Sequence, residues 1–200
     1  MADIYQDRYL AHQEVKKSLL SPTSNGEAIK LISNKELGVL KKIVDSRASS
    51  RVYNKIPVDK EVLESILQDL CKTPSSCNRQ TISLMVIEDR DRKELLSGLL
   101  VGGVGWIHRA DKILLLFANG EAYKENLFYM PYLDAGVMIQ QLYLSCTANN
   151  VSCCYINPNI REINQEHFKK TFSNLIFCGA LALGHSDTVI KSPKRESCLL

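Results

Sequence analysis

Apolar residues recur along the chain at two spacings, and each spacing predicts a type of element. Where they fall every three or four residues they mark the buried face of a helix. Such segments predict helices over 35–47, 62–70, 92–100, 132–149 and 161–171. Short, almost continuous apolar runs predict strands over 81–87, 113–118, 153–156 and 175–183. Helices that alternate with apolar strands indicate an α+β or α/β fold in which helices cover a sheet.

The first 34 residues form a separate segment of this pattern. Apolar and tyrosine side chains keep a helical spacing as far as Leu19, and Ser21-Pro22 ends the helix that they predict. We therefore expect a helical extension at 1–34 and one domain at 35–200. The extension is either a helix packed on that domain or an arm that crosses to a second subunit.

Composition narrows the function classes. Of 200 residues, 45% are hydrophobic and 24% charged, as is usual for a soluble domain with a sizeable core. The net charge of +3 argues against a nucleic-acid partner, and no apolar run approaches the roughly 18 residues of a membrane span. The seven cysteines include no C-x-x-C pair and the four histidines are isolated, so we expect no metal. An odd number of thiols without a signal peptide favours the cytoplasm.

Two polar clusters stand at junctions between predicted elements. Arg47, Ser49 and Arg51 follow a helix, and two guanidiniums with a hydroxyl suit a phosphate. Arginines at a helix end are also what the helix dipole favours. The second cluster, "TPSSCNRQ" (73–80), offers hydroxyls, an amide pair and a guanidinium before a strand. A basic tail, "KSPKR" (191–195), is either a third part of the site or a solvated terminus.

Other features favour simpler interpretations. "VGGVGW" (101–106) lacks the full G-x-G-x-x-G pattern. It therefore predicts a flexible turn, or a lid edged by Trp106, rather than a phosphate loop. Asp134 predicts a satisfied carboxylate at a helix start. Cys153 and Cys154 would point to opposite faces of a strand and predict two buried thiols.

The order of these boxes resembles the nitroreductase family of flavin enzymes. That family's R-x-S-x-R-x-[FY] box is matched by residues 47–53, and its [AS]-P-S-S-x-N-x-Q box by residues 73–80. The later segment "LDAGVMIQQLYLSC" is similar to the family's D-x-G-x-x-x-Q-N-L helix, and a strand with a glycine and a basic tail follow it. The resemblance covers roughly residues 36–196.

The resemblance implies a fold and a cofactor. The fold would be α+β and nitroreductase-like, a central mixed sheet flanked by helices, in an intertwined homodimer that binds FMN noncovalently at its interface. Arg47, Ser49 and Arg51 would hold the phosphate and ribityl end of FMN. Lys194 and Arg195 in the tail would close on the phosphate.

The second box would contribute the other side of the site. Asn78 would meet the polar edge of the isoalloxazine or ribityl group, and Pro74, Ser75 and Ser76 would reach the flavin from the partner subunit. The implied activity is ping-pong hydride transfer from NAD(P)H to a small aromatic, nitro or quinone-like acceptor, with no side-chain acid or base.

Three departures from the family's pattern leave other functions open. Ala48 stands where the family often has a basic residue, Thr81 where it usually has proline, and residues 149–156 lack its glycine-rich turn. One alternative is a flavin-binding protein of the same fold with a specialised biosynthetic or regulatory role and little NAD(P)H turnover. Another is a purely structural dimer module.

Overall fold

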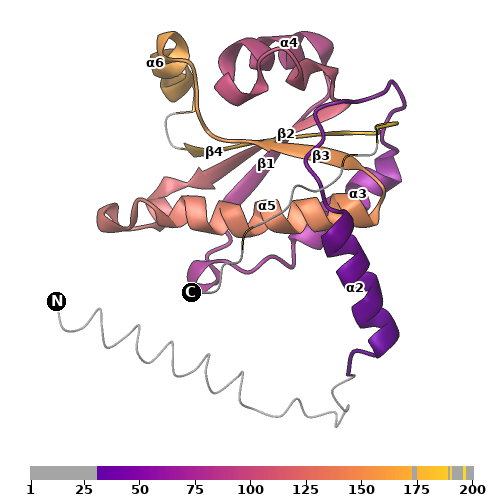
Figure 1. The fold of residues 1–200 in the computed structure, drawn as a ribbon. Helices are drawn as coiled ribbons and strands as arrows, with labels where there is room; N and C mark the ends of the chain where they lie inside the picture. Colours follow the sequence, from indigo (N-terminus) through magenta and orange to yellow (C-terminus); the bar gives the residue numbers. More distant parts are fainter. Residues whose placement is uncertain (1–30, 173–174, 189, 191–195, 197–200) are drawn as a thin grey trace, which may run out of the picture. The chain divides into compact units, whose positions relative to one another are not determined.

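The computed structural model describes residues 31–172, 175–188, 190 and 196 (Figure 1). The chain divides into two compact units, Met1–Gly38 and Val39–Leu200, each described by itself. The predicted helix within 1–34 falls on residues outside the described ones, so the extension remains a prediction.

Helix α2 (Asn34–Ser46) begins at a capping box in the first unit. The Ser33 backbone N–H and hydroxyl both donate to Oε2 of Glu36 at 2.7 Å, and the Glu36 N–H donates back to Oγ of Ser33 at 3.3 Å. These reciprocal bonds satisfy N–H groups that a helix start leaves without partners. The bond from the Ser33 backbone holds the pKa of Glu36 below its ordinary value.

The second unit contains the remaining helices and all the described strands. The helices are α3 (Lys60–Leu70), α4 (Arg90–Leu99), α5 (Met130–Ala148) and α6 (Glu162–Thr171). The strands are β1 (Ile82–Ile87), β2 (Lys112–Asn119), β3 (Ser152–Ile156) and β4 (Leu175–Gly184). Every one lies within two residues of its predicted range.

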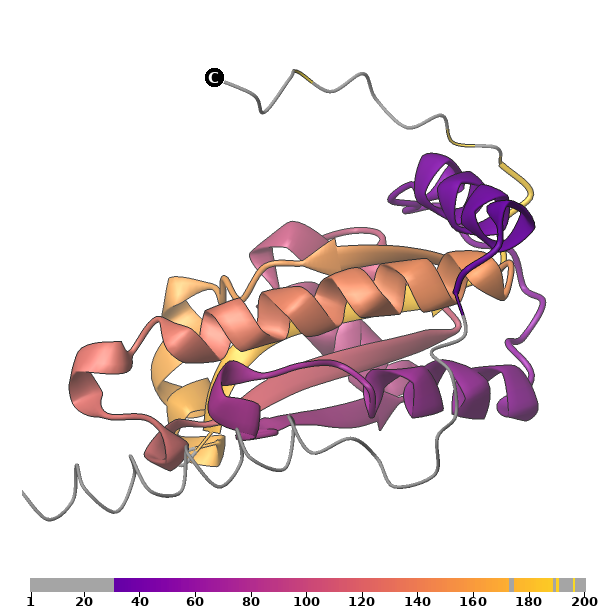
Figure 2. The ribbon, with the colours of Figure 1, turned by 90° about the horizontal axis from the view of Figure 1, so that it is seen from below.

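The strands form one sheet in the order β1-β2-β4-β3, with every neighbouring pair antiparallel. In the described residues, the parallel part of the expected mixed sheet is a single bridge between Ser49 and Cys153. Helices cover both faces: α5 and α3 lie on one side, and α4 and α6 on the other (Figures 1 and 2). Because both faces are covered, β2 is buried from Ile113 to Ala118, which explains its uninterrupted apolar sequence.

Strand β4 is irregular beside its glycine. The pairing register with β2 shifts between Leu116 and Phe117, and Gly179 has a left-handed φ of 112°. A Cβ at Gly179 would lie 2.6 Å from the backbone oxygen of Ile156 and 2.6 Å from the Tyr155 side chain. Only glycine fits at this point of the sheet.

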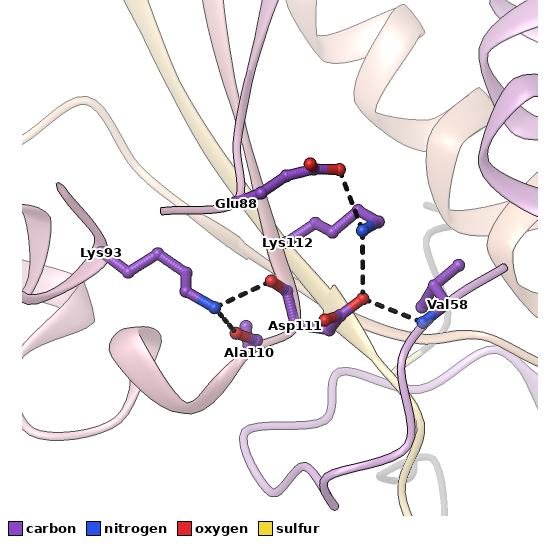
Figure 3. Close-up of polar contacts among 6 residues, drawn as sticks. All are labelled: Val58, Glu88, Lys93, Ala110, Asp111 and Lys112. Carbon is purple, nitrogen blue, oxygen red and sulfur yellow. Dashed lines mark hydrogen bonds and ion pairs between the residues drawn. The ribbon is translucent and has the colours of Figure 1, made fainter. Parts of the chain in front are cut away.

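A polar network at the start of β2 fixes the segment that follows the R-x-S-x-R-x-[FY] box at 47–53, called the arginine box below (Figure 3). Oδ2 of Asp111 accepts a bond from the Val58 N–H at 2.9 Å. Nζ of Lys112 lies 2.9 Å from Glu88 and 3.4 Å from the same Asp111 oxygen. Nζ of Lys93 donates to the carbonyl of Asp111 at 2.9 Å and to the preceding carbonyl at 3.0 Å. The segment that follows the arginine box is thereby tied to the sheet at Val58.

Candidate functional site

The arginine box covers the free edge of the sheet. Because β3 is an edge strand, Cys153 and Tyr155 direct their outer backbone groups away from β4. Cys153 accepts a bond from the Ser50 N–H at 2.9 Å, and the Tyr155 N–H donates to the hydroxyl of Tyr143 at 2.8 Å. The loop and a side chain from α5 thus satisfy an edge that would otherwise be open.

Each candidate phosphate ligand in this box contacts an aromatic side chain. The Ser49 hydroxyl lies 3.0 Å from the Tyr143 hydroxyl. Cζ of Arg47 lies 5.3 Å from the centroid of the Tyr143 ring, and Cζ of Arg51 lies 5.8 Å from that of Trp106. These are cation–π distances. The predicted trio therefore lies together, with both guanidiniums held on aromatic faces.

Tyr53 anchors the end of the box. Its hydroxyl lies 2.8 Å from the carbonyl oxygen of Ser50 and 3.1 Å from that of Ala182 in β4. Its ring stacks on Trp106 at 6.5 Å between centroids. Burial raises the pKa of this hydroxyl well above its ordinary value, so it stays a neutral donor. Trp106 is part of the packing around the box, and the lid interpretation has no support in these contacts.

The two guanidiniums of the box, those of Arg47 and Arg51, have no carboxylate partner in the part of the chain that the structure describes. Cys153 and Cys154 are both 1% exposed, as the strand pattern predicted. Burial raises the pKa of Cys154 despite the opposing charge of Arg51, which favours the protonated thiol. The cationic pair is available to an anionic ligand.

The second box forms a loop with an unusual backbone. Ser76–Asn78 make one 3₁₀ turn, and the Ser75 hydroxyl accepts a bond from the Gln80 N–H at 2.9 Å. Cys77, Asn78 and Gln80 have left-handed φ angles of 50°, 53° and 52°. All three side chains are exposed. Left-handed conformations cost roughly 1 kcal/mol or more outside glycine, so something must hold this loop.

Asp134 helps to stabilise this loop. It was predicted at the start of a helix, and that position was wrong. Helix α5 begins at Met130, so Asp134 lies in its second turn rather than at its start. Its carboxylate accepts bonds from the Ser76 N–H at 2.9 Å and the Tyr123 hydroxyl at 2.7 Å. Arg79 turns inward, with Cζ 5.5 Å from the centroid of the Tyr123 ring. The Arg79 side chain therefore lies on the buried side of the loop, against Tyr123.

A pocket of about 420 Å³ lies beside this loop. Its apolar wall comes from α3, β1 and α5 together with Pro74, and its polar rim includes Ser75 and Gln80. The hydroxyl of Thr73 on the same rim is buried and has no hydrogen-bond partner in the described part of the chain. The volume is within the usual range for small-molecule pockets.

Both boxes contact α5, but at different places. The first meets it at Tyr143 and the second at Asp134, nine positions apart in the sequence. At 1.5 Å of rise per residue this is about 13 Å along the helix axis. The structure therefore brings Arg47, Ser49 and Arg51 into one cluster and Pro74 to Asn78 into another, as two half-sites.

The remaining site residues divide into untested and missed ones. Lys194 and Arg195 lie outside the described residues. Trp106 was predicted only as the edge of a lid, and Tyr143 and Tyr123 were missed by sequence reasoning. Tyr143 lies within the segment "LDAGVMIQQLYLSC", where no local signal indicates that its hydroxyl turns toward the arginine box. Along the described residues, no helix combines the length and apolarity needed to cross a membrane.

Comparison with solved structures identifies the architecture. Nitroreductase A from Vibrio parahaemolyticus superposes with a TM-score of 0.69 at 21% identity, covering 78% of this chain and 71% of that one. An FMN-dependent nitroreductase from Clostridium difficile gives 0.66 at 22% identity, covering 76% and 90%. The chain has the nitroreductase fold. A structure from Desulfovibrio desulfuricans, described as a nitroreductase in complex with FMN, gives 0.67 at 24% identity over 78% and 91%.

Sequence comparison agrees over the two boxes. The family model for the nitroreductase family matches residues 44–104. An FMN reductase [NAD(P)H] of Bacillus subtilis is 37% identical over 81 residues, which are 40% of this chain. The chain spans about a third of that relative's length, 32%. The resemblance inferred from the motifs is thereby confirmed, with the nitroreductase fold.

Proposed function

We propose that this protein is an FMN-dependent oxidoreductase that uses NAD(P)H to reduce a small aromatic, nitro or quinone-like acceptor. The observation that carries the proposal is the arginine box. Arg47 and Arg51 flank Ser49 and, within the described residues, have no carboxylate partner. Forked, permanently charged donors beside a hydroxyl suit a phosphate monoester.

The residues present fit FMN at both half-sites. Arg47, Ser49 and Arg51 would hold the phosphate and ribityl end, and Lys194 and Arg195 would close on the phosphate. Asn78 would meet the polar edge of the flavin. Bound FMN would supply two-electron redox chemistry, accepting hydride from NAD(P)H before it reduces the second substrate. The chain's own part is to bind, orient and shield the cofactor.

A homodimer would join the half-sites. One chain holds them about 13 Å apart along α5, so Pro74, Ser75 and Ser76 would approach FMN from the partner subunit. Tyr129, which precedes α5, and Leu133 and Val137 on it recur every four residues and are 46%, 57% and 46% exposed. An apolar stripe of this kind on a long helix favours burial against a second copy.

The direct test is FMN binding by an arginine variant. Arg47→Ala should raise the dissociation constant for FMN at least tenfold, since a charge-assisted bond contributes about 1.5–3 kcal/mol. Arg90→Ala is the matched control, because Arg90 is an exposed arginine on α4, across the sheet from α5. Fluorescence titration of desalted protein measures both. Equal affinities for the two variants would contradict the phosphate assignment.

Turnover separates the proposed oxidoreductase from the alternative. Protein saturated with FMN should oxidise NADH or NADPH once a quinone or nitroaromatic acceptor is added. Bound FMN without that oxidation would favour a specialised flavin-binding role. We also propose a cytoplasmic location, in keeping with free thiols at every cysteine described.

A further inference from the structure

The loop of the second box rests on a directed chain of hydrogen bonds. The Tyr123 hydroxyl lies 2.7 Å from Oδ2 of Asp134 and 2.6 Å from Oγ1 of Thr81. A carboxylate accepts hydrogen bonds and donates none, so Tyr123 gives its one proton to Asp134. Thr81 must then donate to Tyr123. The other oxygen of Asp134 accepts from the Ser76 N–H at 2.9 Å.

Arg79 holds the same residue from its other side. Nη1 of Arg79 donates to the carbonyl of Ser76 at 3.1 Å, while its guanidinium packs on the Tyr123 ring. Both backbone groups of Ser76 are thus fixed by side chains that meet at Tyr123. Burial raises the pKa of the Tyr123 hydroxyl, which keeps it a neutral donor to Asp134.

The backbone immediately after Ser76 needs such a support. Cys77, Asn78 and Gln80 are left-handed, a conformation that residues other than glycine rarely adopt. Strained backbone persists where the surrounding structure over-determines it, and it gathers at functional sites. Here the contacts of Asp134 and Arg79 fix the buried side of the loop, whereas the three strained side chains are exposed on its other side. Asp134 is 6% exposed and lines the pocket beside the loop, and both of its carboxylate oxygens are engaged, one by the Ser76 N–H and one by the Tyr123 hydroxyl.

We propose that Asp134 is a positioning residue that, through Tyr123 and Ser76, presents Asn78 to FMN bound at the interface. This inference rests on the proposed function and extends it to residues that act on the FMN site through other residues. Its physical content is preorganisation: the loop is fixed before the ligand arrives, so binding need not order it.

Hydrogen–deuterium exchange of the full chain tests the support without cofactor. In Asp134→Ala, peptides across 73–81 should exchange at least tenfold faster than in the wild type, because the Ser76 N–H loses its acceptor. Asp134→Asn should stay near the wild type, since its amide oxygen still accepts from the Ser76 N–H while its amide NH2 donates to the Tyr123 hydroxyl, which then donates to Thr81. Tyr123→Phe, which keeps the ring that Arg79 packs on, gives a second reading if Asp134→Ala does not fold. Unchanged exchange in both disruptive variants would overturn the proposal.

FMN titration then tests the link to the site. Asp134→Ala should bind FMN at least tenfold more weakly, and Asp134→Asn should recover most of that loss. Asp69→Ala is the matched control, because it removes a 2.6 Å bond from the Ser145 hydroxyl to another carboxylate packed on α5. Faster loop exchange with unchanged FMN affinity would overturn the positioning role. A wild type that binds no FMN would refute the proposed function instead, and exchange would still show whether Asp134 holds the loop.

Discussion

The hydroxyl of Tyr143 joins the arginine box to the sheet edge and to α5, so removing that one oxygen is an informative perturbation. In Tyr143→Phe the ring stays, and with it the packing of a side chain that is only 9% exposed. The variant loses the acceptor for the Tyr155 N–H, at 2.8 Å, and the partner of the Ser49 hydroxyl, at 3.0 Å.

The loss of stability in Tyr143→Phe follows from the Tyr155 N–H that is left without an acceptor. No cavity forms beyond one oxygen atom, so the cost is that of an unsatisfied backbone donor at the sheet edge, about 1–3 kcal/mol. For a protein of this size, about 2 kcal/mol lowers Tm by roughly 4–8 °C. Ser49 would lose the bond that orients it, and a 1.4 kcal/mol loss there would weaken FMN binding about tenfold.

Urea denaturation followed by circular dichroism measures the free energy of unfolding. The variants are compared at equal protein concentrations, because association contributes to the stability of a dimer. Tyr132→Phe is the control: Tyr132 lies on the same helix, is 46% exposed, and its hydroxyl makes no hydrogen bond to a described residue. It should change the free energy of unfolding by less than about 0.5 kcal/mol. If Tyr143→Phe were as stable as Tyr132→Phe, the edge-capping role of the hydroxyl would be refuted.

Three further changes have definite expected outcomes. Gly179→Ala should destabilise by about 3 kcal/mol or more, because its Cβ would meet the Ile156 oxygen at 2.6 Å; a urea midpoint equal to that of Gly98→Ala, where nothing lies within 4 Å, would be inconsistent with this. Burial raises the pKa of Cys178 to about 11, from 9.0, so its neutral form stabilises the folded state fully below pH 9. That contribution should be lost as pH rises from 9 to 11, at up to about 1.4 kcal/mol per pH unit, and Cys178→Ala should flatten the curve. Asp111→Ala should lower Tm by a few degrees, since the Val58 N–H and Lys112 both lose a partner; an unchanged scan would show that the network is dispensable.

The sequence was sufficient for the elements because their signals are local. The apolar run 113–118 marks a strand covered on both faces, and the spacing of apolar side chains marks the helices. The two boxes could also be recognised from the sequence, since their residue types are those that phosphate and heterocycle recognition require. The arginine trio does lie in one cluster.

Long-range pairings could not be predicted from local patterns. The bond between Ser76 and Asp134 joins residues 58 positions apart, and that between Ser49 and Tyr143 joins residues 94 apart. Nothing in "TPSSCNRQ" marks three left-handed residues without a glycine, because tertiary bonds impose that backbone. At the end of α5, where the family's glycine-rich turn is missing, Asn150 is left-handed at φ 56°, and the Val151 N–H donates to the carbonyl of Cys146 at 2.8 Å.

FMN titration of the desalted wild-type protein, read by visible absorbance, tests the central claim most directly. If the arginine box holds the FMN phosphate, binding should saturate near one FMN per chain, the flavin spectrum should survive a second desalting, and replacing Arg47 by alanine should weaken binding. A protein that remains colourless after incubation with excess FMN would contradict that claim.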